Sequence, residues 1–148
     1  VAKREELQAM KIAADAAIIL ARRHAEALIQ LATKESNPQR KAELEHMASI
    51  CQWVPENAPR TFHEALQHYW FIHLGVITEL NPWDSFNPGR LDQHLWPFYQ
   101  QEVKAGTLTE EYAKELLQSF WVKFNNHPAP PKTGVTARRA TPTPILHL

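Results

Sequence analysis

A nearly uninterrupted apolar segment, "YWFIHLGVI" at residues 69–77, constrains the fold of this chain more than any other feature. It lies in a helix that we expect to begin at Thr61, because Thr61 and Glu64 have the three-residue spacing of a capping box. A helix without a polar face must be buried on most sides. A chain of 148 residues with about five helices can hardly surround it, so the sequence predicts packing partners that these residues do not supply.

The charge balance and the cysteine content exclude several classes of protein. Sixteen basic and sixteen acidic residues cancel, which leaves no net field to attract nucleic acid or an anionic membrane. The single cysteine, Cys51, excludes an internal disulfide framework and a cysteine-based zinc site, and it suits a reducing compartment. No apolar run reaches the roughly 18 residues of a membrane span. We therefore expect a cytoplasmic protein without a nucleic-acid or membrane partner.

The N-terminal third of the chain predicts two helices. Residues 3–32 form a long amphipathic helix, and residues 38–51 form a more polar one. The prolines of residues 54–60 then predict an extended connector, because each disfavours the helical conformation in the residue before it. The apolar or small stripe expected on the first helix comprises Leu7, Met10, Ala14, Ala17, Ala21, Leu28 and Leu31.

Two further helices complete a mostly α fold of about five helices, with no convincing strand. One is expected at residues 89–105, with Pro97 as a kink and Gly106 as its end. Thr109 caps the other. The expected apolar face of that last helix comprises Tyr112, Leu116, Phe120 and Phe124.

Most residues that might carry chemistry favour a structural interpretation. "HEALQH" resembles a zinc-binding helix, but His63 and His68 are five residues apart, about 140° around a helix, so we expect no metal site. His68 and His73 have the same spacing and are expected to be core histidines bonded to backbone. Cys51 is expected to be a buried, inert thiol. Core packing is the expected role of the aromatic residues Trp70, Phe71, Trp96, Phe98, Phe120 and Trp121.

The segment "ELNPWDSFNPGRLDQH", at residues 79–94, allows two interpretations. Asp84 follows Trp83 between two prolines, an arrangement that suits a desolvated acid pointing into a pocket. In the alternative, the segment is a surface turn in which Asp84 accepts backbone hydrogen bonds and Arg90 pairs with Asp92 or Glu79. The residues alone leave both open.

Residues 59–126, "PRTFHEALQHYWFIHLGVITELNPWDSFNPGRLDQHLWPFYQQEVKAGTLTEEYAKELLQSFWVKFNN", resemble the N-terminal half of the pyruvate formate-lyase-type glycyl radical enzymes. The likeness is greatest to their lyase and dehydratase branch, and it extends over most of the chain through Ala137. "NPWDSFNPGR" and "NNHPAPPKTGVTA" are most similar to choline trimethylamine-lyase and its near relatives.

The resemblance implies that the chain is a piece of an α/β ten-stranded barrel wrapped in helices. It also implies that the segment after the apolar helix reaches the substrate pocket. There Asp84, with Trp83 and Val76, would bind substrate, and an acid at position 84 suits a cationic or hydroxylated molecule. The sequence departs from the choline enzyme at Val76, where a tyrosine is expected.

The resemblance further implies a catalytic cysteine motif and a radical-bearing glycine motif, and neither is present in these 148 residues. Cys51 corresponds to a peripheral helix, so we expect no catalytic residue here. We expect a truncated, inactive piece of a parent enzyme, with residues 1–137 as the partial domain. Residues 138–148 are an atypical tail, such as a frameshift followed by an early stop would produce.

The parent is expected to cleave a C–N, C–O or similar bond of a small molecule by thiyl-radical chemistry. Its glycyl radical would be installed by a radical S-adenosylmethionine activating enzyme, and it would form a homodimer. The alternative is a stand-alone helical protein-interaction module whose apolar helix docks on a partner.

Overall fold

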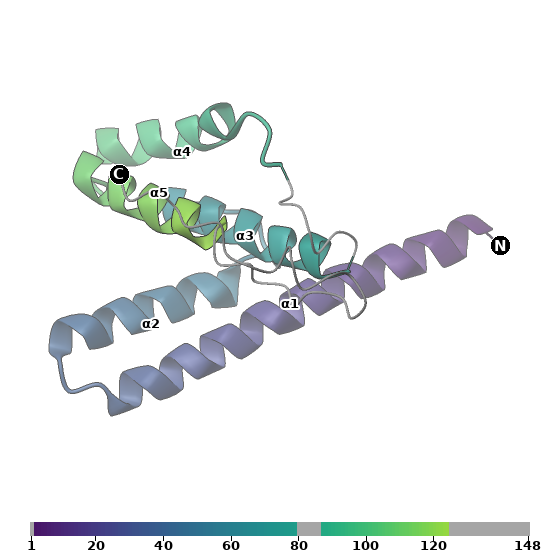
Figure 1. Cartoon of the computed structure of the whole chain (residues 1–148), viewed down its shortest axis with the longest axis horizontal. Coiled ribbons are helices and arrows are strands. Elements are labelled where there is room, and N and C mark those ends of the chain that lie inside the picture. Colours follow the sequence, from purple (N-terminus) through teal and green to yellow (C-terminus); the bar gives the residue numbers. More distant parts are fainter. Residues whose placement is uncertain (1, 80–86, 125–148) are drawn as a thin grey trace, which may run out of the picture. The chain divides into compact units, whose positions relative to one another are not determined.

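A computed structural model describes residues 2–79 and 87–124 (Figure 1). Within these residues the chain forms five helices and no strand, which confirms the predicted mostly α fold. None of the described helices is both long and apolar enough to cross a membrane. The helices are α1 (Ala2–Lys34), α2 (Pro38–Trp53), α3 (Phe62–Glu79), α4 (Leu91–Ala105) and α5 (Glu110–Phe124).

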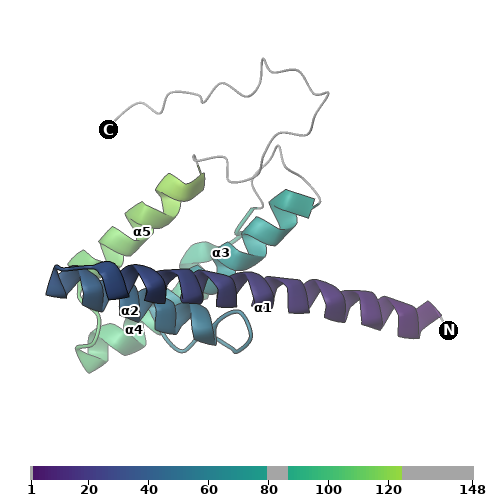
Figure 2. The same ribbon diagram turned by 90° about the horizontal axis from the view of Figure 1, so that it is seen from below.

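The chain divides into two compact units, Val1–Ile72 and His73–Leu148, and the division falls within α3. In the first unit, α1 and α2 lie side by side and antiparallel (Figures 1 and 2). The turn between them is fixed by Asn37, whose side-chain oxygen accepts hydrogen bonds from the backbone N–H groups of Gln39 and Arg40 at 2.9 and 3.2 Å. Pro38 follows as the first helical residue, where its missing N–H costs nothing.

Small side chains on α1 form the core of the first unit. Ala21 and Ala25 are almost completely buried and let Cys51 and Phe71 approach the α1 backbone closely. Leu20 and Leu28 pack around this cluster. The connector after α2 starts as a hydrogen-bonded turn, since the Asn57 N–H donates to the Trp53 carbonyl oxygen at 3.0 Å. The prediction of a fully extended connector is therefore wrong for its first half.

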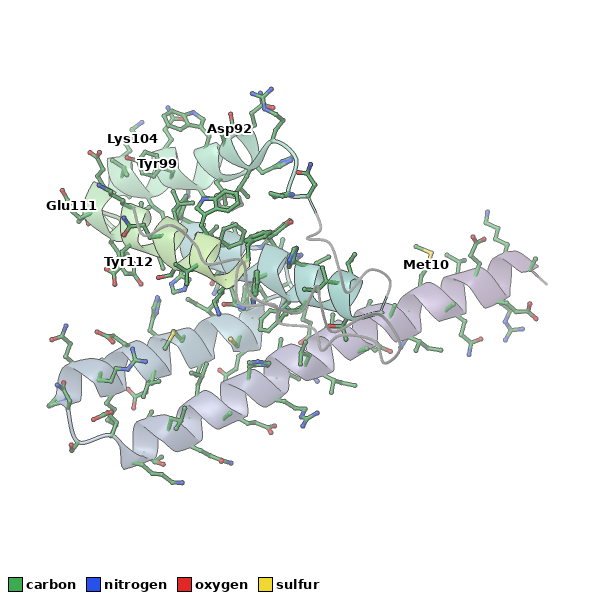
Figure 3. All side chains as sticks on the ribbon, viewed as in Figure 1. Met10, Asp92, Tyr99, Lys104, Glu111 and Tyr112 are labelled. Atoms are coloured by element: carbon green, nitrogen blue, oxygen red, sulfur yellow. The ribbon has the colours of Figure 1, made fainter. Side chains whose placement is uncertain are left out.

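Of the predicted stripe on α1, Ala21 and Leu28 contribute to the core. Ala21 is buried and Leu28 packs on the core, but Leu7, Met10 and Leu31 are 57%, 63% and 55% exposed. The N-terminal half of α1 extends past α2, and Met10 projects from it (Figures 1 and 3). Residues 2–14 are all exposed, so this end of α1 has an apolar surface that the other described residues do not cover.

In the second unit, helix ends follow the predicted signals. Gly106 ends α4 with φ of 71°, a left-handed conformation that glycine adopts without strain. The Thr109 hydroxyl accepts a hydrogen bond from the Tyr112 N–H at 3.1 Å and caps α5. Helix α4 continues through Pro97.

The aromatic residues divide between core and surface. Trp70, Phe71 and Phe120 are buried, as predicted. Trp96 and Trp121 are 55% and 51% exposed, so the prediction of core packing is wrong for both. Tyr112 is also 40% exposed and does not join the buried face of α5, which contains the predicted Phe120 together with Ala113. Helical spacing identifies an apolar position but does not say whether another element reaches it.

Candidate functional site

The candidate site is at helix α3, because the segment with the predicted substrate contacts begins where this helix ends. The contacts at both ends of α3 decide how the helix is held. Buried residues occur around much of α3, as its apolar sequence predicts; they are Phe62, Glu64, Ala65, Leu66, Trp70, Phe71, His73 and Ile77. Several positions in the second half of the helix are more open. Ile72 is 38% exposed, and Gly75 and Val76 are partly exposed.

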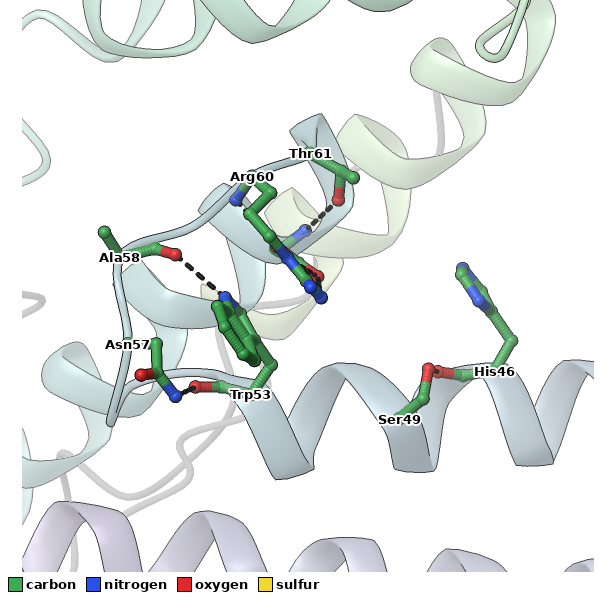
Figure 4. Close-up of polar contacts among 8 residues, drawn as sticks. His46, Ser49, Trp53, Asn57, Ala58, Arg60 and Thr61 are labelled. Atoms are coloured by element: carbon green, nitrogen blue, oxygen red, sulfur yellow. Dashed lines mark hydrogen bonds and ion pairs between the residues drawn. The ribbon is translucent and has the colours of Figure 1, made fainter.

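The first turn of α3 is fixed by a buried carboxylate (Figure 4). The Glu64 backbone N–H donates to the Thr61 hydroxyl at 3.1 Å, which is the predicted half of the capping box. The reciprocal bond is displaced by one residue, because the Glu64 carboxylate accepts from the Arg60 backbone N–H at 2.7 Å. The same carboxylate accepts from the Arg60 guanidinium at 2.6 Å.

An aromatic ring connects this turn to the end of α2 (Figure 4). The Arg60 guanidinium carbon lies 3.8 Å from the centre of the Trp53 ring, within the range of a cation–π contact. The Trp53 indole N–H in turn donates to the Ala58 carbonyl oxygen at 2.9 Å. The connector between α2 and α3 therefore holds the start of α3 in a fixed position.

The pKa values at this turn follow from the same contacts. Burial alone would raise the pKa of Glu64, but the hydrogen bonds and the charge of Arg60 outweigh it and lower that pKa below its ordinary value. Glu64 is therefore ionised in the folded protein at neutral pH. Helical spacing gave no signal for this pair, since Arg60 precedes the first residue of α3.

Of the two histidines predicted to lie in the core, His73 is buried, whereas His68 is only partly buried. Burial, with the neighbouring His46, lowers the pKa of His63 to about 4. Burial lowers the pKa of His68, and a hydrogen bond with the Asn57 backbone offsets part of that shift, while the Nδ1 atom of His68 has no hydrogen-bond partner among the described residues. The His73 ring is 1% exposed and lies 4.6 Å from the Phe124 ring, centre to centre. The described residues contain no group of three or more histidine, cysteine, aspartate or glutamate side chains that could hold a metal ion.

Cys51 lies on α2 in the core of the first unit, 6% exposed, and faces Ala21, Ala25 and Phe71. Apolar surroundings disfavour the thiolate, which is the reactive form of cysteine. The expected buried, inert thiol is thus consistent with its place in the fold.

Two of the three predicted substrate-binding residues, Trp83 and Asp84, lie outside the described residues. The third, Val76, lies in the last turns of α3 and is partly exposed. Beyond the gap, Arg90 pairs with Asp92 at 3.3 Å on the exposed surface, which raises the pKa of Arg90 and lowers that of Asp92. The surface-turn interpretation predicted that Arg90 pairs with Asp92 or Glu79. The pair does not show where Asp84 lies, so the role of Asp84 stays a prediction.

Just before α4 the backbone turns sharply. The Gly89 N–H donates to the Asn87 side-chain oxygen at 2.8 Å, and Gly89 has φ of 64°. Only glycine adopts this conformation without strain. The turn fixes where the preceding segment enters α4, with Asp92 in its first helical turn (Figure 3).

Comparisons with known proteins give a consistent result. A family model described as pyruvate formate lyase-like matches residues 1–146. Trans-4-hydroxy-L-proline dehydratase of Clostridioides difficile is 51% identical over 139 residues, which are 94% of this chain and 18% of that protein. Isethionate sulfite-lyase of Nitratidesulfovibrio vulgaris is 48% identical over 122 residues, 82% of this chain and 15% of that protein.

A solved structure extends the likeness to the fold. The crystal structure of hydroxyproline dehydratase from Clostridioides difficile, with trans-4-hydroxy-L-proline bound, matches with a TM-score of 0.80 and 53% identity. The match covers 87% of this chain and 16% of that one. The chain therefore spans less than a fifth of the length of these relatives.

Proposed function

Because the chain belongs to the pyruvate formate lyase-like family of glycyl radical enzymes, we propose that it forms one wall of the substrate pocket of a full-length lyase or dehydratase. That enzyme removes a leaving group from the carbon next to a hydroxylated carbon, or from the hydroxylated carbon itself. The single observation that carries this proposal is the 51% identity to trans-4-hydroxy-L-proline dehydratase across 94% of the chain.

The substrate we favour is a small hydroxylated molecule with a cationic nitrogen, such as trans-4-hydroxy-L-proline. Two features support it. The crystal structure described above holds that substrate, and the acid at position 84 suits a cation or a hydroxyl group. Choline has the same two groups and is the second candidate, supported by the likeness of "NPWDSFNPGR" to the choline enzyme. Val76, in place of the tyrosine expected there, gives the pocket an aliphatic surface.

Within this proposal the residues of this chain bind and position the substrate, and they do not carry the radical. Val76 at the end of α3, with Trp83 and Asp84 after it, contacts the substrate. The Arg60–Glu64 pair positions the start of the same helix. The radical chemistry, which removes a hydrogen atom from the substrate, comes from cysteine and glycine residues outside these 148. A radical S-adenosylmethionine activating enzyme, a homodimeric assembly and a cytoplasmic location complete the proposal.

Substitution of Asp84 tests the proposal in the full-length, activated enzyme. Asp84→Asn keeps the shape of the side chain and removes its charge, and Asp84→Ala also removes the acceptor. Each should lower kcat/KM about ten- to a hundredfold, because a charged partner in a dry pocket contributes about 1.5–3 kcal/mol.

The measurement is steady-state kinetics with trans-4-hydroxy-L-proline and choline, with the glycyl radical counted by electron spin resonance. Equal radical content ensures that poor activation is not mistaken for poor binding. Unchanged kcat/KM in both variants would return Asp84 to a surface turn.

A further inference from the structure

Two histidines meet where α2 contacts the start of α3. His46 lies on α2 and His63 lies in the first turn of α3, and their ring centres are 5.6 Å apart with the planes at 62°, an edge-to-face contact. His46 is exposed and His63 is partly buried. Trp53, about two turns after His46, lies on the same side of α2 and contacts Arg60 (Figure 4). Both rings of α2 therefore face the start of α3.

The carboxylates near the two histidines are already engaged. Glu64, next to His63 on α3, is held by the Arg60 guanidinium of the connector at 2.6 Å. Glu43, about one turn before His46 on α2, pairs with Arg40 at 2.8 Å. Burial, and after it His46, lowers the pKa of His63 to about 4, and the charge of Glu64 raises that pKa by less than either lowers it.

We propose that the His46–His63 contact is an acid-sensitive connection between α2 and α3: it holds the start of α3 while at most one ring is charged, and it loosens when both are protonated. Histidine changes its charge between about pH 5 and pH 8. Two like charges with ring centres 5.6 Å apart repel strongly where water is partly excluded. This connection is a property of the fold and does not depend on the proposed function.

A second histidine contact in the same unit shows what the pair adds. His24 of α1 makes an edge-to-face contact of nearly the same geometry, 5.7 Å between ring centres and 69° between planes, but its partner is Phe71. Phenylalanine does not titrate, so protonation of His24 brings no second charge into that contact. The two contacts differ in whether the partner ring can be charged, which makes His24 the matched control.

The test is backbone hydrogen exchange in the full-length enzyme, read by mass spectrometry on peptides that cover residues 46–51 and 62–66. Protection, the exchange rate relative to the intrinsic rate at the same pH, is measured from about pH 7.5 to about pH 5. The pKa of Glu64 lies below 4.5, so this carboxylate stays ionised over the whole range. The variants are His46→Gln, His63→Gln, the two combined, and the control His24→Gln.

The unfolded chain takes up the proton of His63 first as the pH falls, because the pKa of His63 is about 4 in the folded protein and its ordinary value is 6.5. Protection in the wild type should therefore fall about thirtyfold between pH 7.5 and pH 5. His63→Gln should remove most of this pH dependence. His46→Gln should remove part of it, because the burial of His63 remains.

Two comparisons identify the pair as the cause. His46→Gln should change the pH dependence when His63 is present and should add nothing in the His63→Gln background, since coupled residues are not additive. His24→Gln should keep the pH dependence of the wild type. If His63→Gln already lacks protection at about pH 7.5, His63→Phe replaces it, because phenylalanine keeps the ring contact without a titrating group.

Three results would overturn the inference. One is wild-type protection that stays within about twofold between pH 7.5 and pH 5. Another is a His46→Gln variant with the pH dependence of the wild type, since His63 would then respond to burial alone. The third is a pH dependence in His63→Phe as steep as in the wild type. None of these measurements involves substrate turnover, so they stand or fall separately from the proposed function.

Discussion

The buried carboxylate of Glu64 is the contact whose loss can be worked out most fully. Glu64 is 4% exposed and accepts from the Arg60 backbone N–H at 2.7 Å and from its guanidinium at 2.6 Å. Glu64→Gln keeps the shape of the side chain but replaces one of its two acceptor oxygens with an NH2 group. That group cannot accept the hydrogen bonds that Arg60 donates. Hydrogen bonds to a charged group contribute about 1.5–3 kcal/mol. We therefore expect the first turn of α3 to lose about 2 kcal/mol of local stability.

Hydrogen exchange of the backbone amides of residues 60–66 measures this local loss. A loss of about 2 kcal/mol corresponds to exchange about thirtyfold faster. Glu45→Gln is the matched control, because it makes the same chemical change at an exposed position of α2. Exchange within about twofold of the wild type in Glu64→Gln would refute the assignment of that energy to the carboxylate.

Acid should reproduce the effect in the wild-type protein. The pKa of Glu64 is lower in the folded protein than its ordinary value of 4.5. The stability that its charge contributes is therefore present above pH 4.5 and is lost as the pH falls through the folded-state value. The protection of residues 60–66, that is, their exchange rate relative to the intrinsic rate at the same pH, should fall below about pH 4.5 in the wild type and change less in Glu64→Gln.

Three further predictions concern other parts of the chain. Burial lowers the pKa of His63 from its ordinary 6.5 to about 4. Between these two pH values His63 is protonated in the unfolded chain but not in the folded one. Stability should then drop by up to about 3 kcal/mol toward pH 4, and denaturant titrations of His63→Gln should show a flatter pH profile. Gly106→Ala should cost about 1 kcal/mol in the same titration, because φ is 71° there; an unchanged midpoint would contradict the left-handed end of α4. The 148-residue chain alone should bind a hydrophobic dye or oligomerise, since Leu7, Met10 and Ile12 are 57%, 63% and 62% exposed. A monodisperse monomer with a sharp thermal transition would favour an independent interaction module.

The helices and their ends could be predicted because their signals are local. Thr61, Thr109 and Gly106 act through hydrogen bonds and backbone angles that depend on a few neighbouring residues. The structure contains each of these signals where the sequence places it.

Burial was less predictable, because it depends on elements that are distant in sequence. Trp96 and Trp121 have the spacing of core residues yet remain exposed. The stacking of Arg60 on Trp53 requires the connector to fold back on α2, and no periodic pattern encodes that contact. Of the three predicted substrate-binding residues only Val76 lies in the described part of the chain, and the roles of Val76, Trp83 and Asp84 all remain predictions. The separate tail from residue 138 also remains a prediction, since residues 125–148 lie outside the described part of the chain.

A chimeric enzyme gives the most direct test that this chain forms a substrate-binding segment of a glycyl radical enzyme. The 139 matching residues of the Clostridioides difficile trans-4-hydroxy-L-proline dehydratase would be replaced by those of this chain. Product formed from trans-4-hydroxy-L-proline and from choline would then be measured per glycyl radical. We predict a folded, radical-bearing chimera that converts at least one of these substrates, and that loses this activity about ten- to a hundredfold on Asp84→Asn. A chimera that carries the radical at the level of the unmodified dehydratase but converts neither substrate would contradict the account.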